Sequence, residues 1–98
     1  MRMMLRIQIP VESGNEALKS GQLGAVVRAF VERAKPECIY FTLADGWRTV
    51  VAVIDMQSSS ELPGIGEPFF RELDASIEAA PCMNSEELMA GLQAAGLV

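Results

Sequence analysis

The pair Asp45-Gly46 is the feature that most restricts how this chain can fold. Residues of this kind tolerate the positive φ angles of a two-residue hairpin turn. Strand-like runs flank the pair, residues 37–43 before it and residues 47–56 after it, so we predict two antiparallel strands. A two-residue turn also fixes the register and sets these residues opposite one another: Leu43 and Arg48, Phe41 and Val50, Ile39 and Ala52.

Two further segments alternate between apolar and polar residues. Residues 3–9 place Leu5, Ile7 and Ile9 on one face, which predicts a half-buried strand. Residues 73–79 alternate in the same way, and we expect Pro81 to end that strand. The segment 50–54 is apolar on both faces, which is typical of a central strand covered on both sides.

The segments between these strands have apolar residues at helical spacing, which predicts helices there. Ser13 and Glu16 have the spacing of a capping box, so we expect the first helix to begin there and to divide near Gly21. It should end before Pro36, because a proline disfavours helical geometry in the residue before it. We expect Ser60 to cap a second helix.

The remaining helical signals lie later in the chain. Pro68 should kink the second helix. Asn84 and Glu87 predict the start of a short C-terminal helix, whose Leu88 and Leu92 we expect to face the core.

The element order is therefore β-α-β-β-α-β-α, and we predict a single domain over residues 1–98. The first six elements form a ferredoxin-like α+β arrangement with a four-stranded antiparallel sheet. Right-handed crossovers favour the strand order 4-1-3-2, with the helices on one face of the sheet.

Composition narrows the possible functions. Eight basic and thirteen acidic residues leave a net charge of -5, which argues against nucleic-acid or anionic-membrane partners. The chain has no histidine and two cysteines, so we predict no metal site, no cofactor and no histidine-based catalysis. Arg6 and Gln8 interrupt the first apolar run, and no segment has the length of a membrane span, so we expect a cytoplasmic protein.

The face of the sheet away from the helices mixes apolar and polar residues. Tyr40, Val51, Val53 and Met4 would form an exposed apolar patch on it, which a second copy of the same sheet could cover. The polar residues would then line the enclosed space, and they are our candidate ligand-binding residues: Arg6, Gln8, Tyr40, Thr49, Ser76 and Glu78.

Several segments carry a family resemblance. Residues 36–42 with 45–49, and 67–70 with 81–84, resemble small uncharacterised bacterial proteins of the dimeric α/β-barrel superfamily. That resemblance implies a homodimer in which two ferredoxin-like subunits pack sheet to sheet. Haem-degrading monooxygenases and YciI-like proteins of this superfamily typically rely on a histidine, so their catalytic residues do not carry over to this chain.

Three functional hypotheses follow. The first is a homodimeric module that binds a small, partly apolar molecule in an interior cavity. The second is a cofactor-independent monooxygenase or isomerase that uses Tyr40, Arg6 and a carboxylate. The third is a structural or interaction protein with a filled interior, in which Arg6 and Glu78 pair with each other.

Overall fold

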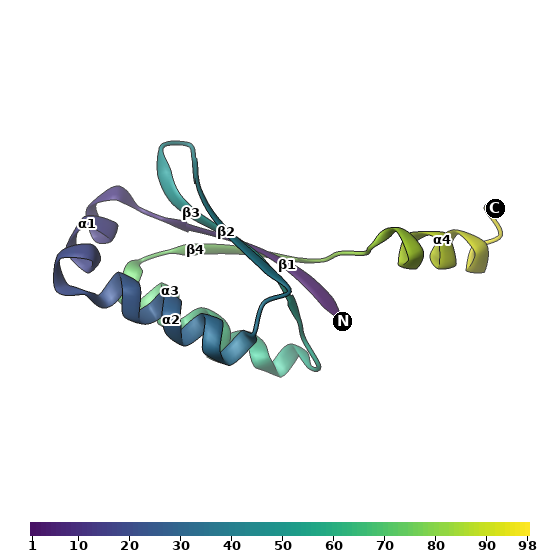
Figure 1. Ribbon diagram of the computed structural model, residues 1–98, viewed down its shortest axis with the longest axis horizontal. Coiled ribbons are helices and arrows are strands. Elements are labelled where there is room, and N and C mark those ends of the chain that lie inside the picture. The colour runs from purple at the N-terminus through teal and green to yellow at the C-terminus, as the bar shows by residue number, and fades with distance from the viewer.

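The computed structural model describes residues 1–98 (Figure 1). The fold is α+β, with a four-stranded antiparallel sheet and four α-helices. The elements in chain order are β1 (Arg2–Ile9), α1 (Val11–Ser20), α2 (Gln22–Ala34), β2 (Cys38–Ala44), β3 (Trp47–Asp55), a 3-10 turn (Ser59–Glu61), α3 (Leu62–Leu73), β4 (Ser76–Pro81) and α4 (Ser85–Ala94).

The strands are arranged β2-β3-β1-β4. Read from the β4 edge, this is the order 4-1-3-2. The predicted hairpin register is confirmed, because Leu43 pairs with Arg48, and the other two predicted pairs follow it along the strands. Both turn residues have positive φ, 55° at Asp45 and 78° at Gly46, as a two-residue turn of this kind requires.

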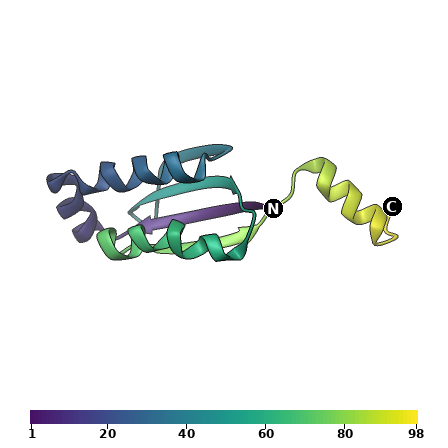
Figure 2. The ribbon, with the colours of Figure 1, turned by 90° about the horizontal axis from the view of Figure 1, so that it is seen from below.

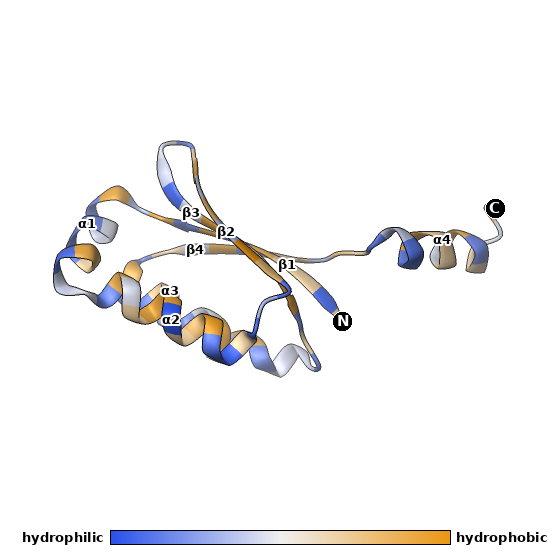
Figure 3. Ribbon diagram, viewed as in Figure 1, coloured by the Kyte–Doolittle hydropathy of each residue, from blue (hydrophilic) through white to orange (hydrophobic).

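One face of the sheet is covered by α1, α2 and α3, as Figure 2 shows. The core lies between this face and the helices, and Figure 3 shows hydrophobic residues on both layers. Leu5, Ile7 and Ile9 are buried, as the alternation predicted. The rings of Phe30 on α2 and Phe69 on α3 meet edge to face, with centroids 5.5 Å apart, and join the two longer helices.

The start of α1 corrects the predicted capping box. The helix begins at Val11, directly after Pro10, and Ser13 lies inside its first turn. The Ser13 hydroxyl donates instead to the carbonyl of Leu73, at 2.7 Å, and thereby ties α1 to the end of α3. The predicted break at Gly21 is confirmed, since this residue has φ 82° and separates α1 from α2.

The second half of the chain contains two further corrections. Ser58, not Ser60, caps the turn that leads into α3, in a capping box with Glu61. The helix α3 continues through Pro68 and ends at Leu73, a residue that the alternation places in the fourth strand. Asp74 ends it in the left-handed conformation, at φ 50°, and β4 begins only at Ser76.

The helix α4 does not pack on the core as predicted. It extends beyond the end of the sheet, and the molecule measures 53 × 27 × 17 Å as a result (Figure 1). No residue of α4 is buried, and Leu88 is 46% exposed. The sheet face opposite α1–α3 is therefore uncovered, and we call it the open face.

Candidate functional site

The open face is organised as rows of residues that run across all four strands. The strand registers give three complete rows. The first polar row is Tyr40, Val51, Arg6 and Glu78; the second polar row is Thr42, Thr49, Gln8 and Ser76; the apolar row is Cys38, Val53, Met4 and Ala80. All six candidate residues therefore lie in two adjacent rows.

Arg6 occupies the centre of the first polar row, on the inner strand β1. Its guanidinium lies 3.8 Å from a carboxylate oxygen of Asp45 and 3.9 Å from one of Glu78. Both distances exceed the range of a direct hydrogen bond, so the N–H donors of Arg6 make no hydrogen bond to either carboxylate, and the three side chains together carry one excess negative charge. The side chain is 39% exposed, which leaves it accessible from the open face.

Tyr40 stands in the same row as Arg6, with Val51 between them. The side chain is 68% exposed, and its hydroxyl makes no hydrogen bond within the chain. The phenol of Tyr40 and the guanidinium of Arg6 form no hydrogen bond within the chain, and both present hydrogen-bond donors to the same side of the sheet.

In the second polar row, by contrast, two side chains form hydrogen bonds with backbone carbonyls of the same chain. Gln8 donates from Nε2 to the carbonyl of Ala44, at 3.3 Å. Thr49 donates from Oγ1 to the carbonyl of Trp47, at 3.0 Å, and is only 2% exposed. Ser76 is exposed at the β4 edge.

The tip of the β2–β3 hairpin reaches over this end of the open face. Gln8 on β1 donates a hydrogen bond to the carbonyl of Ala44, the last residue of β2. Arg6, also on β1, lies near Asp45 in the turn. Figure 1 shows the hairpin rising on the side away from the helices. Thr49, in the row beside Gln8, is buried at this end of the open face. The sequence predicted that Asp45 lies in the turn, but not that its carboxylate lies near Arg6. A local turn pattern carries no information about contacts with β1.

The opposite end of the open face holds a second charged group that sequence reasoning missed. Arg2 donates from Nε to Glu37 Oε1 at 2.9 Å and also pairs with Glu87 of α4. The hydrogen bond that Arg2 donates to Glu37, followed by the charges of Glu37 and Glu87, raises the pKa of Arg2. The predicted alternating strand began at residue 3 and did not include Arg2, and nothing in the sequence connected Arg2 to Glu37 or Glu87.

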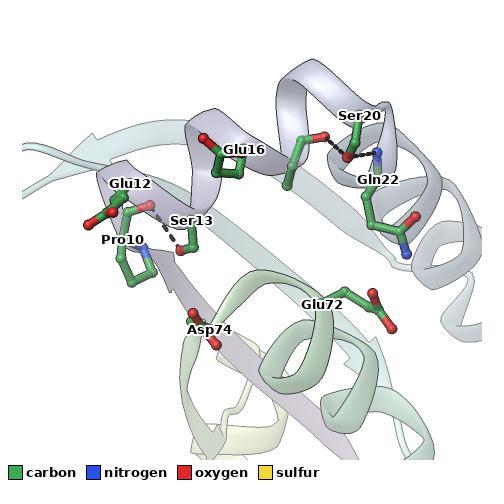
Figure 4. A pocket seen from close by; sticks show the side chains of 9 residues that line it. Pro10, Glu12, Ser13, Glu16, Ser20, Gln22, Glu72 and Asp74 are labelled. Atoms are coloured by element: carbon green, nitrogen blue, oxygen red, sulfur yellow. Dashed lines mark hydrogen bonds between the residues drawn. The ribbon is translucent and has the colours of Figure 1, made fainter.

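Several hollows lie on the helix side. An open cleft of about 810 Å³ between α1 and α3 is lined by several carboxylates, from Glu12, Glu16, Glu72 and Asp74. Figure 4 shows these groups spread around the rim rather than directed at one point. No group of three or more His, Cys, Asp or Glu side chains is placed to hold a metal ion.

Another hollow on this side is an apolar groove of about 520 Å³ beside the edge strand β2. Leu18, Leu23 and Val27 line it from the helices, and Phe41 and Leu43 line it from β2. Both cysteines are free thiols, Cys38 on β2 and Cys82 just after β4, so they belong to opposite edges of the sheet.

Comparison with known proteins adds information on the fold alone. No protein-family model matches the chain, and no curated protein matches it. The structure is similar to that of a de novo designed protein, Ferredog-Diesel, with a TM-score of 0.53 and 17% sequence identity. The match covers 83% of this chain and 85% of that one. No helix here is long and apolar enough to cross a membrane.

Proposed function

We propose that this ferredoxin-like chain is a homodimeric binding module whose open faces pack together and enclose a small, partly apolar molecule with an acid group. The observation that carries the proposal is the first polar row. Arg6 and Tyr40 are separated there by one valine, and neither has a hydrogen-bond partner in its own chain. A guanidinium with free donors can bind a carboxylate in a bidentate manner, and a phenol can donate a further hydrogen bond.

The apolar residues of the open face support the proposal that a second sheet packs on it. Met4 is 46% exposed, and Val51 and Val53 are only half-buried on strands at the centre of the sheet. Apolar surface of this kind is stabilised when it leaves water. A second copy offers the same surface, and an isologous pair buries it on both chains at once.

A second candidate function is an interaction protein with a filled interior. The internal hydrogen bonds of Gln8 and Thr49 favour it, because these residues need no ligand to satisfy them. The two proposals differ in what fills the space beside Arg6. A ligand occupies it in the first, and side chains of the partner occupy it in the second.

Native mass spectrometry of the full chain tests the assembly. We expect a mass of twice the 10.6 kDa of one chain. A bound molecule would add a discrete mass that denaturation releases. A chain that stays monomeric would contradict both candidate functions, whereas a dimer without added mass would favour the filled interior.

Anilinonaphthalene sulfonate, an aromatic anion, is a suitable probe of the binding site. We expect Arg6→Met to weaken its binding by about ten- to a hundredfold, which corresponds to the loss of a charged hydrogen bond. Arg71→Met is the matched control, since Arg71 lies in the last turn of α3, on the helix side. Equal binding by both variants would contradict the role of Arg6.

A further inference from the structure

The strand β2 forms one edge of the sheet and lacks the features that keep edge strands from pairing with other chains. Its seven residues, Cys38–Ala44, include no charged residue and no proline. The strand at the opposite edge, β4, carries Glu78 and ends at Pro81. Charged side chains and proline are common means of protecting an exposed edge. The β2 edge is therefore open to an added strand, whereas the β4 edge is protected.

The hairpin determines which backbone groups of β2 point outward. Its two-residue turn makes Ala44 and Trp47 a hydrogen-bonded pair, and such pairs alternate along an antiparallel ladder. The backbone groups of Ile39, Phe41 and Leu43 therefore point away from β3. No backbone hydrogen bond outside the sheet involves these three residues. Each of them offers one N–H donor and one carbonyl acceptor to a further strand.

The apolar groove beside β2 borders this edge on the helix side. Phe41 and Leu43 line it from β2 and are 61% and 71% exposed. Leu18, Leu23 and Val27 line it from α1 and α2. Residues that lie directly opposite each other in an antiparallel pair place their side chains on the same face of the sheet. A strand added to β2 would thus direct every second side chain into this groove.

The charges at the groove indicate what such a strand carries. Arg48 is the only charged residue in the lining, which contains no carboxylate. Its guanidinium donates to Asn15 Oδ1 at 3.0 Å but forms no ion pair. Arg28, whose guanidinium lies beside the lining residue Gly24, forms no ion pair either. In a chain with a net charge of -5, this groove is a basic site that favours a partner with a carboxylate.

We propose that the β2 edge binds an extended peptide of a partner protein as an added antiparallel strand, with large apolar side chains in the groove and a carboxylate near Arg48. Arg48 lies opposite Leu43, so the acidic residue belongs at the turn end of β2. A second copy fits less well, because its own β2 brings no carboxylate to the two arginines. The site lies outside the open face and does not depend on the proposed dimer.

A probe peptide tests the proposal by fluorescence anisotropy. The probe is fluorescein-Thr-Glu-Thr-Leu-Thr-Val-Thr-amide, whose glutamate, leucine and valine fall opposite Leu43, Phe41 and Ile39. We expect N-methylation of these three probe residues to weaken binding by at least about tenfold, because it removes the N–H donors that face β2. N-methylation of the threonines between them is the matched control, since their N–H groups face solvent, and it should change the affinity little.

Two variants of the protein test the groove. We expect Val27→Glu to weaken binding of the probe by about tenfold or more, because it puts a charge among the apolar side chains. Ala25→Glu is the matched control, since Ala25 is exposed on the side of α2 toward α3. Arg48→Met should weaken binding of the probe by about tenfold but should leave unchanged the binding of a probe with glutamine in place of glutamate.

Amide hydrogen exchange of the full chain shows directly whether a strand is added. We expect the probe to slow exchange at Ile39, Phe41 and Leu43 by at least about tenfold, and to change it little at Tyr40 and Thr42, which already bond to β3. Absence of binding, or binding without this alternation, would overturn the proposal. Equal affinity of the N-methylated probe would also overturn it and would leave the groove as a site for an apolar anion. Protection of the same amides that rises with protein concentration, without probe, would assign the edge to a second copy instead.

Discussion

Arg6 and Glu78 are directly opposite each other on neighbouring strands, yet the closest atoms of their charged groups are 3.9 Å apart. The side chains are 39% and 74% exposed, so water screens the pair in a single chain. We expect a coupling free energy below about 1 kcal/mol in a double-mutant cycle of Arg6→Gln and Glu78→Gln. Urea unfolding of a dilute, monomeric sample measures it.

Cover by a second sheet would change this coupling. Removal of water strengthens the attraction between the charges, so the coupling should rise at protein concentrations where the dimer dominates. A coupling that does not depend on concentration would mean that the pair stays exposed in the assembly. The same cycle therefore reports whether the open face is the dimer interface.

The next prediction uses two glycines that undergo the same change in different backbone conformations. At Gly46 and Gly91 an added methyl group would meet no atom within 4 Å. Gly46 has φ 78°, which an alanine adopts only with strain, so Gly46→Ala should lower the free energy of unfolding by about 1 kcal/mol. Gly91 lies within α4, so Gly91→Ala should favour the helix by about 0.5–1 kcal/mol. Chemical denaturation and circular dichroism measure the two effects, and a common sign would contradict the argument.

The hairpin was predictable because its determinants are local. Asp45 and Gly46 specify the turn, and the turn specifies the register of both strands. The start of α1 was not predictable in the same way, because Ser13 and Glu16 keep the spacing of a capping box although the helix begins earlier, at Val11. In the structure the Ser13 hydroxyl donates to the carbonyl of Leu73, a contact between distant parts of the chain that a local pattern does not show.

The boundary between α3 and β4 was misassigned for a related reason. Leu73 and Ala75 are both buried, so the segment alternates like a strand although Leu73 ends a helix. Asp74 makes that end possible by adopting a positive φ, which a sequence pattern reveals far more readily at glycine. In the same way, periodicity predicted the helix α4 with its Leu88 and Leu92 but carried no information about whether they reach the core.

The core prediction compares two adjacent phenylalanines. Phe69 is 1% exposed and packs edge to face on Phe30, whereas Phe70 is 42% exposed. We expect Phe69→Ala to lower the free energy of unfolding by about 3–5 kcal/mol, because it leaves a cavity between α2 and α3. Phe70→Ala should cost about 1 kcal/mol or less. If Phe69→Ala prevents folding, Phe69→Leu should retain the fold at an intermediate cost, and equal losses at both positions would contradict this account of the core.

The last prediction concerns the dependence of stability on pH. The ammonium group of Met1 donates a hydrogen bond to Asp55 Oδ1 at 2.9 Å, and this bond, with the accompanying charge attraction, lowers the pKa of Asp55. A carboxyl whose pKa is lower in the folded state stabilises the fold above its unfolded value of about 3.9 and loses that effect as the pH falls through the folded value. Asp55→Asn should therefore lower the melting temperature slightly at neutral pH and leave it unchanged well below the folded pKa. Asp74→Asn is the control, because Asp74 is exposed, forms no ion pair and has a backbone conformation that asparagine tolerates. If the melting temperature of Asp55→Asn stayed equally low in acid, the loss would come from altered geometry at the end of β3 and not from the charge of Asp55.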